Sequence, residues 1–189
     1  ENIAKLGGDQ TVLQFMPLAL ASLGLVCSLV GIFAVKLFSS KSADVALRFG
    51  TIGSAIIFIV AAYFMIQSMG ASNGIWVAVL VGAIGGIVVG LVTEYYTGGD
   101  TEDSPVGKIA KSGETGPATV MITGLSVGMQ SVVLPLFVIA GIIGLSTHFT
   151  GLYGVGIAAV GMLATVGITM AIDAYGPVAD NEGGIAEMS

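Results

Sequence analysis

Five long apolar stretches constrain this chain more than any other feature of its sequence. They cover residues 15–38, 49–69, 75–96, 115–147 and 152–172. A helix rises about 1.5 Å per residue, so about 20 apolar residues cross the ~30 Å hydrocarbon core of a bilayer. Each stretch reaches that length, and none alternates apolar and polar residues as the strands of a membrane barrel do. The sequence therefore predicts an all-α, polytopic transmembrane bundle of about five helices, the fifth extending from residue 152 to about residue 182.

The composition supports a membrane protein and excludes several other classes. Hydrophobic residues make up 54% of the chain and charged residues only 10%, whereas soluble domains carry about 25% charged residues. A soluble globule and a disordered chain are therefore excluded. The formal net charge of −6 also argues against nucleic acid as a partner, because phosphate backbones attract basic surfaces. We expect an integral, multi-pass membrane protein.

The basic residues predict how the helices are oriented. Lys36, Lys41 and Arg48 cluster between the first two stretches, and Lys108 and Lys111 lie in the linker 97–114. The linkers on the opposite side, 68–74 and 147–151, contain neither Lys nor Arg. Because short cytoplasmic loops carry an excess of Lys and Arg, we expect a cytoplasmic loop at 97–114 and a cytoplasmic C-terminal end.

The fourth stretch is longer than a bilayer requires. It has no charged residue between positions 115 and 147, and its 33 residues would measure about 50 Å as a helix. We expect it to project, tilt or bend. Pro135 offers a bend point, because it leaves the carbonyl of Ser131 without its helical donor.

Glycines recur at a spacing of four in the third and fourth stretches. Gly82, Gly86 and Gly90 form one series, and Gly124 and Gly128 form another. Small residues at this spacing let membrane helices approach closely. The pattern predicts close helix packing and says nothing about chemistry.

Three acidic residues near the C-terminal end are spaced by seven. They are Asp173, Asp180 and Glu187. Seven residues turn a helix by about 700°, only about 20° short of two full turns, so the three carboxylates would share one face if the helix persists. Pro177 loosens the turn between the first two acids. The pair 183–184, both glycine, is expected to end the helix or to permit close approach of another element.

Carboxylates on one side of a membrane helix can bind hard cations. Mg²⁺ takes oxygen ligands and often keeps waters and substrate phosphates in its coordination shell. The spacing therefore suggests a metal-bridged phosphate site that needs further ligands from elsewhere. The alternative is a solvated acidic helix end with Asp173 hydrogen-bonded to a neighbouring helix. The sequence contains no phosphate-binding P-loop motif and neither of the metal motifs HExxH and CxxC.

The C-terminal segment carries a family resemblance. Residues 171–188 read AIDAYGPVADNEGGIAEM, which resembles the signature of the membrane-integral pyrophosphatases, pumps that couple pyrophosphate hydrolysis to movement of H⁺ or Na⁺. The resemblance continues through GLYGVGIAAVGMLATVGIT at 151–169, EYYT at 94–97, TGPAT at 115–119 and GLSVG at 124–128. It is strong from residue 94 onwards and weaker before that position.

The resemblance implies an internal segment of a larger ion pump. Such a pump is a homodimer in the cell inner membrane or an acidic-organelle membrane, and it moves H⁺ or Na⁺ out of the cytoplasm. It uses Mg²⁺, with K⁺ as a candidate activator. Its partners would be pyrophosphate, the transported ion, the lipid membrane and the remaining helices of the same pump. The segment alone is expected to be inactive.

The resemblance also assigns residues. Asp180 stands just before Asn181 in the AYGPxxDN pattern and is implied to be the catalytic residue that binds Mg-pyrophosphate through the metal. Asp173 is a second candidate metal ligand and a supporting residue, together with Asn181 and Glu187. Glu182 departs from the family pattern, in which small residues are common at this position.

Two other interpretations remain open from the residues alone. The chain could be a membrane domain of a secondary ion carrier, with the stripe of acids from Asp173 to Asp180 as an ion path. It could also be a structural membrane subunit. The acids lie at a helix end and no repeat is evident, which disfavours a carrier.

Overall fold

The structure, a computed structural model, describes residues 6–37, 43–98 and 101–188. The fold is 91% helical, and β-pairing within these ranges is limited to one isolated bridge between Gly7 and Ala71. This confirms the all-α prediction. The elements are α2 (Gln10–Leu37), α3 (Ala43–Ser68), α4 (Asn73–Thr97), α5 (Pro105–Ser112), η1 (Gly113–Thr115), α6 (Pro117–Met162) and α7 (Val166–Met188).

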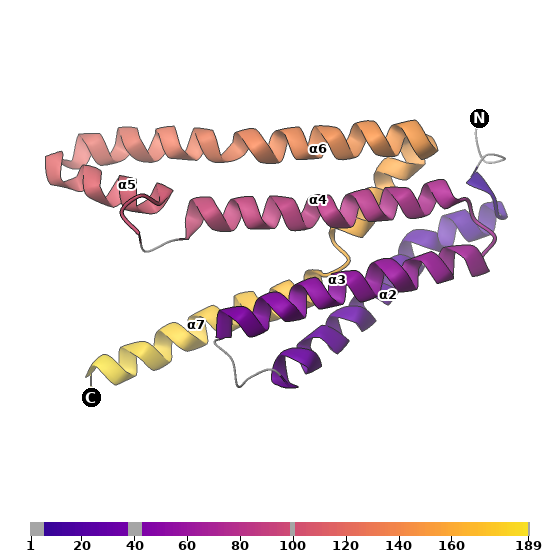
Figure 1. The fold of residues 1–189 in the computed structure, drawn as a ribbon, viewed down its shortest axis with the longest axis horizontal. Helices are drawn as coiled ribbons and strands as arrows, with labels where there is room; N and C mark the ends of the chain where they lie inside the picture. The colour runs from indigo at the N-terminus through magenta and orange to yellow at the C-terminus, as the bar shows by residue number, and fades with distance from the viewer. Residues whose placement is uncertain (1–5, 38–42, 99–100, 189) are drawn as a thin grey trace.

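The long helices form two layers, as Figure 1 shows. In one layer α4 and α6 lie side by side, and in the other α2 packs against α3 and α7. The start of α3, the short helix α5 and the C-terminal end of α7 lie towards the left of the bundle in Figure 1, and the C-terminal end of α2 lies near its middle. The turn between α3 and α4 lies at the opposite end. The segment that contains α5 therefore lies towards the same end of the bundle as the C-terminal end of α7, opposite the α3–α4 turn.

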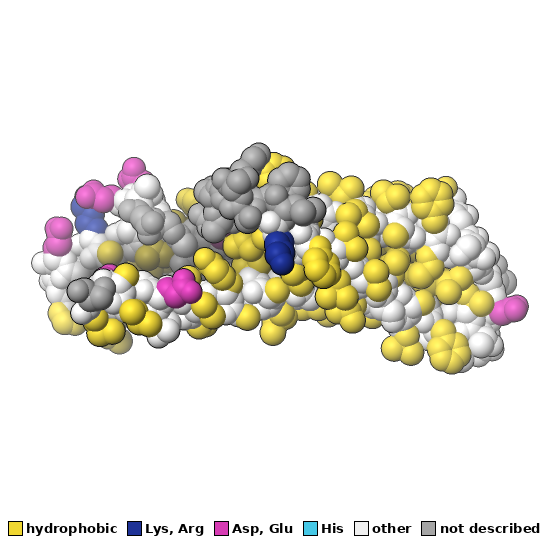
Figure 2. Space-filling model, turned by 90° about the horizontal axis from the view of Figure 1, so that it is seen from below, with side chains coloured by type: hydrophobic (Ala, Val, Ile, Leu, Met, Phe, Trp, Pro, Cys, Tyr) yellow, Lys and Arg dark blue, Asp and Glu magenta, His cyan; other side chains and the backbone are white. Residues whose placement is uncertain are grey.

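Four described stretches are long and apolar enough to cross a membrane. They are Gln10–Lys36, Ala46–Ser68, Asn73–Thr97 and Pro117–Met188. The last has 72 residues and includes α6, which runs to one end of the bundle, and α7, which returns towards the other (Figure 1). It therefore corresponds to two crossings, which agrees with a bundle of about five helices. Apolar side chains cover the body of the face in Figure 2, and most of its acidic side chains gather at the left end.

The chain reverses direction at Gly151. This residue lies within the bounds of α6, but its φ of 67° and ψ of −157° are not helical. A residue with a Cβ rarely adopts this conformation, so glycine is required here. The helix continues through Pro135, which was the expected bend point, and the change in direction comes sixteen residues later. Before Gly151, α6 extends for 34 residues, or about 51 Å, so it is longer than a bilayer core.

A break interrupts the fifth predicted helix, 152–182. The final part of α6 ends at Met162, and α7 begins at Val166. In the break, the amide of Ala164 donates to the Gly161 carbonyl at 3.3 Å and that of Val166 to the Leu163 carbonyl at 3.1 Å. These short-range bonds replace the helical ladder for one turn.

Glycines hold the segments on both sides of this break against their neighbours. A Cβ added at Gly82 of α4 would lie 2.7 Å from the carbonyl carbon of Ala158, and one added at Gly24 of α2 would lie 3.0 Å from the Cα of Ala164. Backbones approach this closely only where side chains are absent. The predicted role of Gly82 in packing is confirmed, whereas a Cβ at Gly90 would meet nothing within 4 Å.

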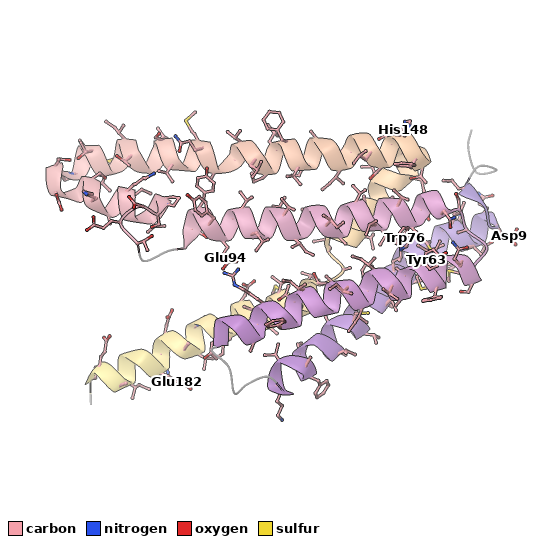
Figure 3. The ribbon with its side chains drawn as sticks, in the orientation of Figure 1. Asp9, Tyr63, Trp76, Glu94, His148 and Glu182 are labelled. Atoms are coloured by element: carbon pink, nitrogen blue, oxygen red, sulfur yellow. The ribbon has the colours of Figure 1, made fainter. Side chains whose placement is uncertain are left out.

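Polar links join the helices at the end of the bundle that contains the α3–α4 turn. The Tyr153 hydroxyl donates to the carbonyl of Leu13 at 2.7 Å, and Trp76 Nε1 donates to the carbonyl of Ile59 at 3.1 Å. The rings of Tyr63 and Trp76 pack edge to face with centroids 5.4 Å apart, as their neighbouring positions in Figure 3 show. These contacts join α6 to α2 and α4 to α3.

Beyond the break, α7 continues as one helix to Met188. It passes through Pro177 and through the glycine pair 183–184, which therefore does not end it. The linker predicted at 97–114 is partly helical, since α5 begins there after Ser104. The hydroxyl of Ser104 accepts from the amide of Gly107 at 2.9 Å, which is the usual arrangement at a helix N-cap.

Candidate functional site

The acidic residues of α7 lie on one continuous helix. Asp173, Asp180 and Glu187 are all exposed, and their spacing of seven places them on one face. Each is about 10.5 Å along the axis from the next. Within the described ranges no ion pair engages any of the three. The carboxylates are therefore available to groups outside this segment.

The side chains of Asn181 and Glu182 leave α7 in different directions from that of Asp180. Asn181 follows it at once, and Glu182 lies two residues on, which is about 200° around the helix. Glu182 therefore projects from the opposite side of α7. Figure 3 places Glu182 on the free end of α7, far from His148 at the other end of the bundle.

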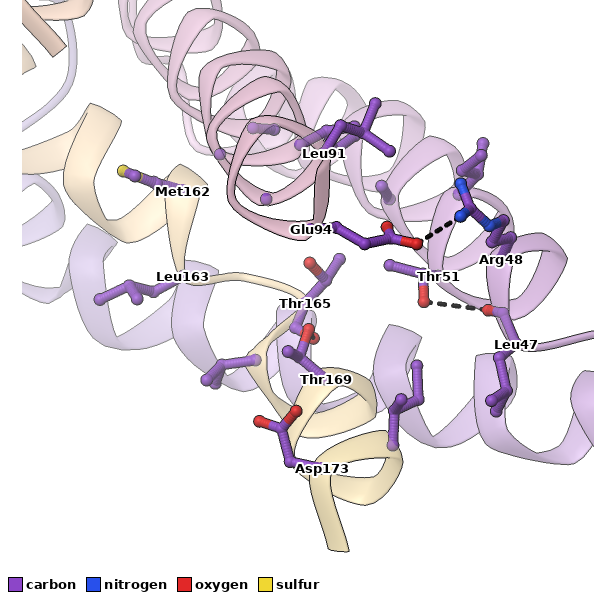
Figure 4. Close-up of a pocket in the computed structure, with 18 of the residues that line it drawn as sticks. Leu47, Arg48, Thr51, Leu91, Glu94, Met162, Leu163, Thr165, Thr169 and Asp173 are labelled. Atoms are coloured by element: carbon purple, nitrogen blue, oxygen red, sulfur yellow. Dashed lines mark hydrogen bonds and ion pairs between the residues drawn. The ribbon is translucent and has the colours of Figure 1, made fainter. Parts of the chain in front are cut away.

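A cavity of about 580 Å³ lies between α3, α4 and the start of α7. Figure 4 shows its lining, which includes the break residues Met162, Leu163 and Thr165. Asp173 lines the same cavity at its outer end. Of the three acids spaced by seven, Asp173 lines this cavity, whereas Asp180 and Glu187 do not.

An ion pair stands on the opposite wall of the cavity. Arg48 of α3 donates to Glu94 of α4 (Figure 4), and their side chains are 57% and 55% exposed. The other ion pair among the described residues joins Lys111 to Glu102 in the linker before α6, at 3.5 Å. The Arg48–Glu94 pair was not predicted, although opposite charges at one end of two successive helices are the sequence signal for it.

Hydroxyl groups continue the polar wall towards the break. Thr165 and Thr169 line the cavity with Asp173, and the three residues are spaced by four, so they share a face of the chain entering α7. Thr169 donates to the carbonyl of Thr165 at 3.3 Å. On α3, Thr51 donates to the carbonyl of Leu47 at 3.0 Å.

No complete metal site is present in the part of the chain that the structure describes. It contains no group of three or more His, Cys, Asp or Glu side chains that could hold an ion. Because every Cβ of a helix tilts towards the N-terminus, Asp173 and Asp180 keep their separation of about 10.5 Å and cannot both bind one ion. Lys41, part of the predicted basic cluster, lies outside the described residues.

Comparison with known proteins identifies the family. A family model described as inorganic H⁺ pyrophosphatase matches residues 2–189. The chain is 43% identical over 202 residues to a putative K⁺-stimulated pyrophosphate-energized sodium pump of Bacteroides thetaiotaomicron, covering 95% of this chain and 27% of that protein. It is 38% identical to a K⁺-insensitive pyrophosphate-energized proton pump of Methanosarcina mazei, covering 92% of this chain and 27% of the pump.

A further relative is similar in extent to this chain. The pyrophosphate-energized proton pump 2 of Mycoplana dimorpha is 39% identical over 186 residues, which cover 92% of this chain and 88% of that sequence. The chain spans about a quarter of the length of the first two pumps. With the match of the family model over nearly its whole length, the chain belongs to the inorganic H⁺ pyrophosphatase family.

Proposed function

We propose that this chain forms part of a membrane pump that hydrolyses Mg-pyrophosphate to phosphate and moves H⁺ or Na⁺ out of the cytoplasm. Two observations support the proposal. The family model covers residues 2–189, and α7 presents Asp173, Asp180 and Glu187 on one face of a continuous helix. The remaining helices of the pump would supply most of the hydrolytic site, since the chain spans about a quarter of the relatives' length.

Asp180 is the residue that we assign to Mg-pyrophosphate. Its carboxylate has the hard oxygen donors that Mg²⁺ prefers, it is exposed, and no ion pair among the described residues engages it. A bound Mg²⁺ would neutralise charge on the phosphate oxygens and so favour attack by water. Asp180 would supply one oxygen ligand, and the other ligands would come from pyrophosphate, water and helices outside this segment.

Asp173, Asn181 and Glu187 receive supporting roles. Asp173 is too far along the helix to share an ion with Asp180, so it would bind a different partner or orient its surroundings. Asn181 and Glu187 would help position the segment around Asp180. The Lys and Arg residues of the linkers support a cytoplasmic position for the Asp180 end of α7, because cytoplasmic loops are rich in these residues. K⁺ would act as an activator in a K⁺-stimulated pump, and the complete pump would be a homodimer.

Phosphate release by the full-length protein tests this assignment. Membranes carrying wild type, Asp180→Asn or Glu182→Gln are compared at matched expression with Mg²⁺ and pyrophosphate. Glu182→Gln removes the same charge from the opposite side of α7 and serves as the matched control. Loss of a metal-phosphate contact worth about 3 kcal/mol lowers the rate about 100-fold, so we expect that loss in Asp180→Asn and near wild-type activity in the control. Near wild-type activity in Asp180→Asn as well as in the control would remove Asp180 from the site.

A further inference from the structure

We infer that the cavity between α3, α4 and the α6–α7 break is a water-filled vestibule, open at the end of the bundle that contains Arg48 and Glu94 and reaching the middle of the membrane. Its ligand is water, and its function is to hydrate the interrupted backbone of a membrane-spanning segment. The inference goes beyond the proposed hydrolysis, because the vestibule requires no pyrophosphate.

The break lies near the middle of the membrane-spanning helices. Gly24, which contacts Ala164, is close to the centre of α2 (Gln10–Leu37). Gly86, which contacts Met162, is close to the centre of α4 (Asn73–Thr97). The contacts with α2 and with α4 therefore independently put the break at the same depth, far from either end of these two helices.

An interrupted helix at this depth needs polar partners. In hydrocarbon an unsatisfied backbone group is costly, so non-helical backbone occurs where it is buried in protein or lines a water-filled cavity. Here Gly161, Met162, Leu163 and Thr165 all line the cavity, and Leu163 is 62% exposed. The break thus borders the cavity. The short-range bonds of the break use one lone pair of the Gly161 and Leu163 carbonyl oxygens, and water in the cavity would donate to the second.

The cavity is long enough to connect the break with the end of the bundle. Along α4 its lining extends from Glu94 to Ala83, eleven residues apart, which is about 16 Å. This is about half of a ~30 Å hydrocarbon core. The outer end is open, because Arg48 and Glu94 are both more than half exposed and Asp173 is exposed.

The lining also has enough polar groups to hold water. An apolar cavity stays dry, whereas a stable internal water makes about three hydrogen bonds to polar partners. Thr165, Thr169 and Asp173 follow one another along one wall, opposite Arg48 and Glu94. The hydroxyl of Thr169 donates to the backbone and keeps its oxygen lone pairs to accept from water. At about 30 Å³ per water, 580 Å³ holds on the order of ten or more molecules.

Cysteine labelling of the full-length protein tests the vestibule. In a background free of cysteine, including Cys27→Ala, single cysteines replace Thr165, Thr169 or Ile84. The probe is a membrane-impermeant, cationic methanethiosulfonate applied from the side that the Arg48 end faces. Thiols react as hydrated thiolates, so a cysteine in the vestibule reacts and one in a dry environment does not. Ile84 is the matched control, because it lies at the depth of Ala83 but outside the cavity lining.

We expect Thr165→Cys and Thr169→Cys to be labelled at least roughly tenfold faster than Ile84→Cys, because a thiol in water ionises and reacts faster than one on the apolar outer surface of α4, where Ile84 is 50% exposed. Both replacements are close in size to threonine, and each protein is checked for membrane insertion and for its elution volume in detergent. Labelling at both positions no faster than at Ile84→Cys would overturn the vestibule, and would mean that lipid or another helix fills the cavity. Labelling needs no pyrophosphate turnover, so this result is independent of the Asp180 experiment.

Discussion

Replacing Gly82 with alanine tests how tightly α4 holds the end of α6. The new Cβ would lie 2.7 Å from the carbonyl carbon of Ala158 and closer still to its oxygen, whereas carbon atoms normally pack about 3.5–4.0 Å apart. The two backbones must therefore separate by about 0.8 Å or more. Overpacking of this kind costs about 1–3 kcal/mol. The obstacle is backbone, so a change of rotamer cannot relieve it.

Gly90→Ala is the matched control on the same helix. A Cβ there meets nothing within 4 Å, and both substitutions gain the same helix propensity, about 0.5–1 kcal/mol in soluble helices. That gain cancels in the comparison, so the difference between the variants measures the clash. The fraction of full-length protein that remains folded in detergent is measured across a temperature series. We expect Gly82→Ala to unfold at a lower temperature than Gly90→Ala; equal midpoints would refute the close packing of α4 and α6.

Three other predictions use the same thermal assay. Gly151→Ala adds no clash within 4 Å but forces alanine to a φ of 67°, so it should cost about 1–3 kcal/mol through backbone strain alone; an unchanged midpoint would contradict the reversal at this residue. A double-mutant cycle of Arg48→Gln and Glu94→Gln should give a coupling of about 0.2–1 kcal/mol, as usual for a solvated pair; coupling of zero would mean that the pair adds no stability. Tyr153→Phe removes the hydrogen bond to the carbonyl of Leu13 and should cost about 0.5–1.5 kcal/mol; a midpoint equal to wild type would show that this link does not hold α6 to α2.

The lengths of the apolar stretches predicted the all-α class and the number of crossings. A helix needs about 20 apolar residues to cross a bilayer, and stretches of that length can be read directly from the sequence. The reversal at Gly151 falls within the linker predicted at 147–151, between the apolar stretches 115–147 and 152–172. Pro135 is a helix breaker in the sequence, yet α6 passes through it, while the change in direction depends on the positive φ of Gly151. The linker 147–151 contains one glycine, Gly151, and the helical break is at that residue rather than at the proline.

The break before α7 carries no local sequence signal. Residues 163–165 read Leu-Ala-Thr, with neither proline nor glycine among them, and leucine and alanine favour helices. The break instead depends on tertiary contacts, with Gly82 against Ala158 on one side and Gly24 against Ala164 on the other. The cavity and the Arg48–Glu94 pair depend on that packing too, so they could not be predicted from periodicity.

The shared face of the three acids at the C-terminal end could be predicted from the sequence, because residues spaced by seven lie on one side of any regular α-helix. Asp173, Asp180 and Glu187 lie on one helix as expected. Their separation along the axis limits any single ion to one of them, which the spacing already implied. The assignment of Asp180 to Mg-pyrophosphate remains a prediction, since the other ligands would come from helices outside this segment.

Paired transport and hydrolysis in one preparation of vesicles would test the central claim most directly. Vesicles containing the full-length protein are supplied with Mg²⁺ and pyrophosphate, and phosphate release is followed together with uptake of H⁺ or Na⁺. We predict that both signals occur in wild type and Glu182→Gln, and that both are lost together in Asp180→Asn. Ion uptake that persists in Asp180→Asn without phosphate release, or a wild type that shows neither signal, would contradict the account of this segment as part of a pyrophosphate-driven pump.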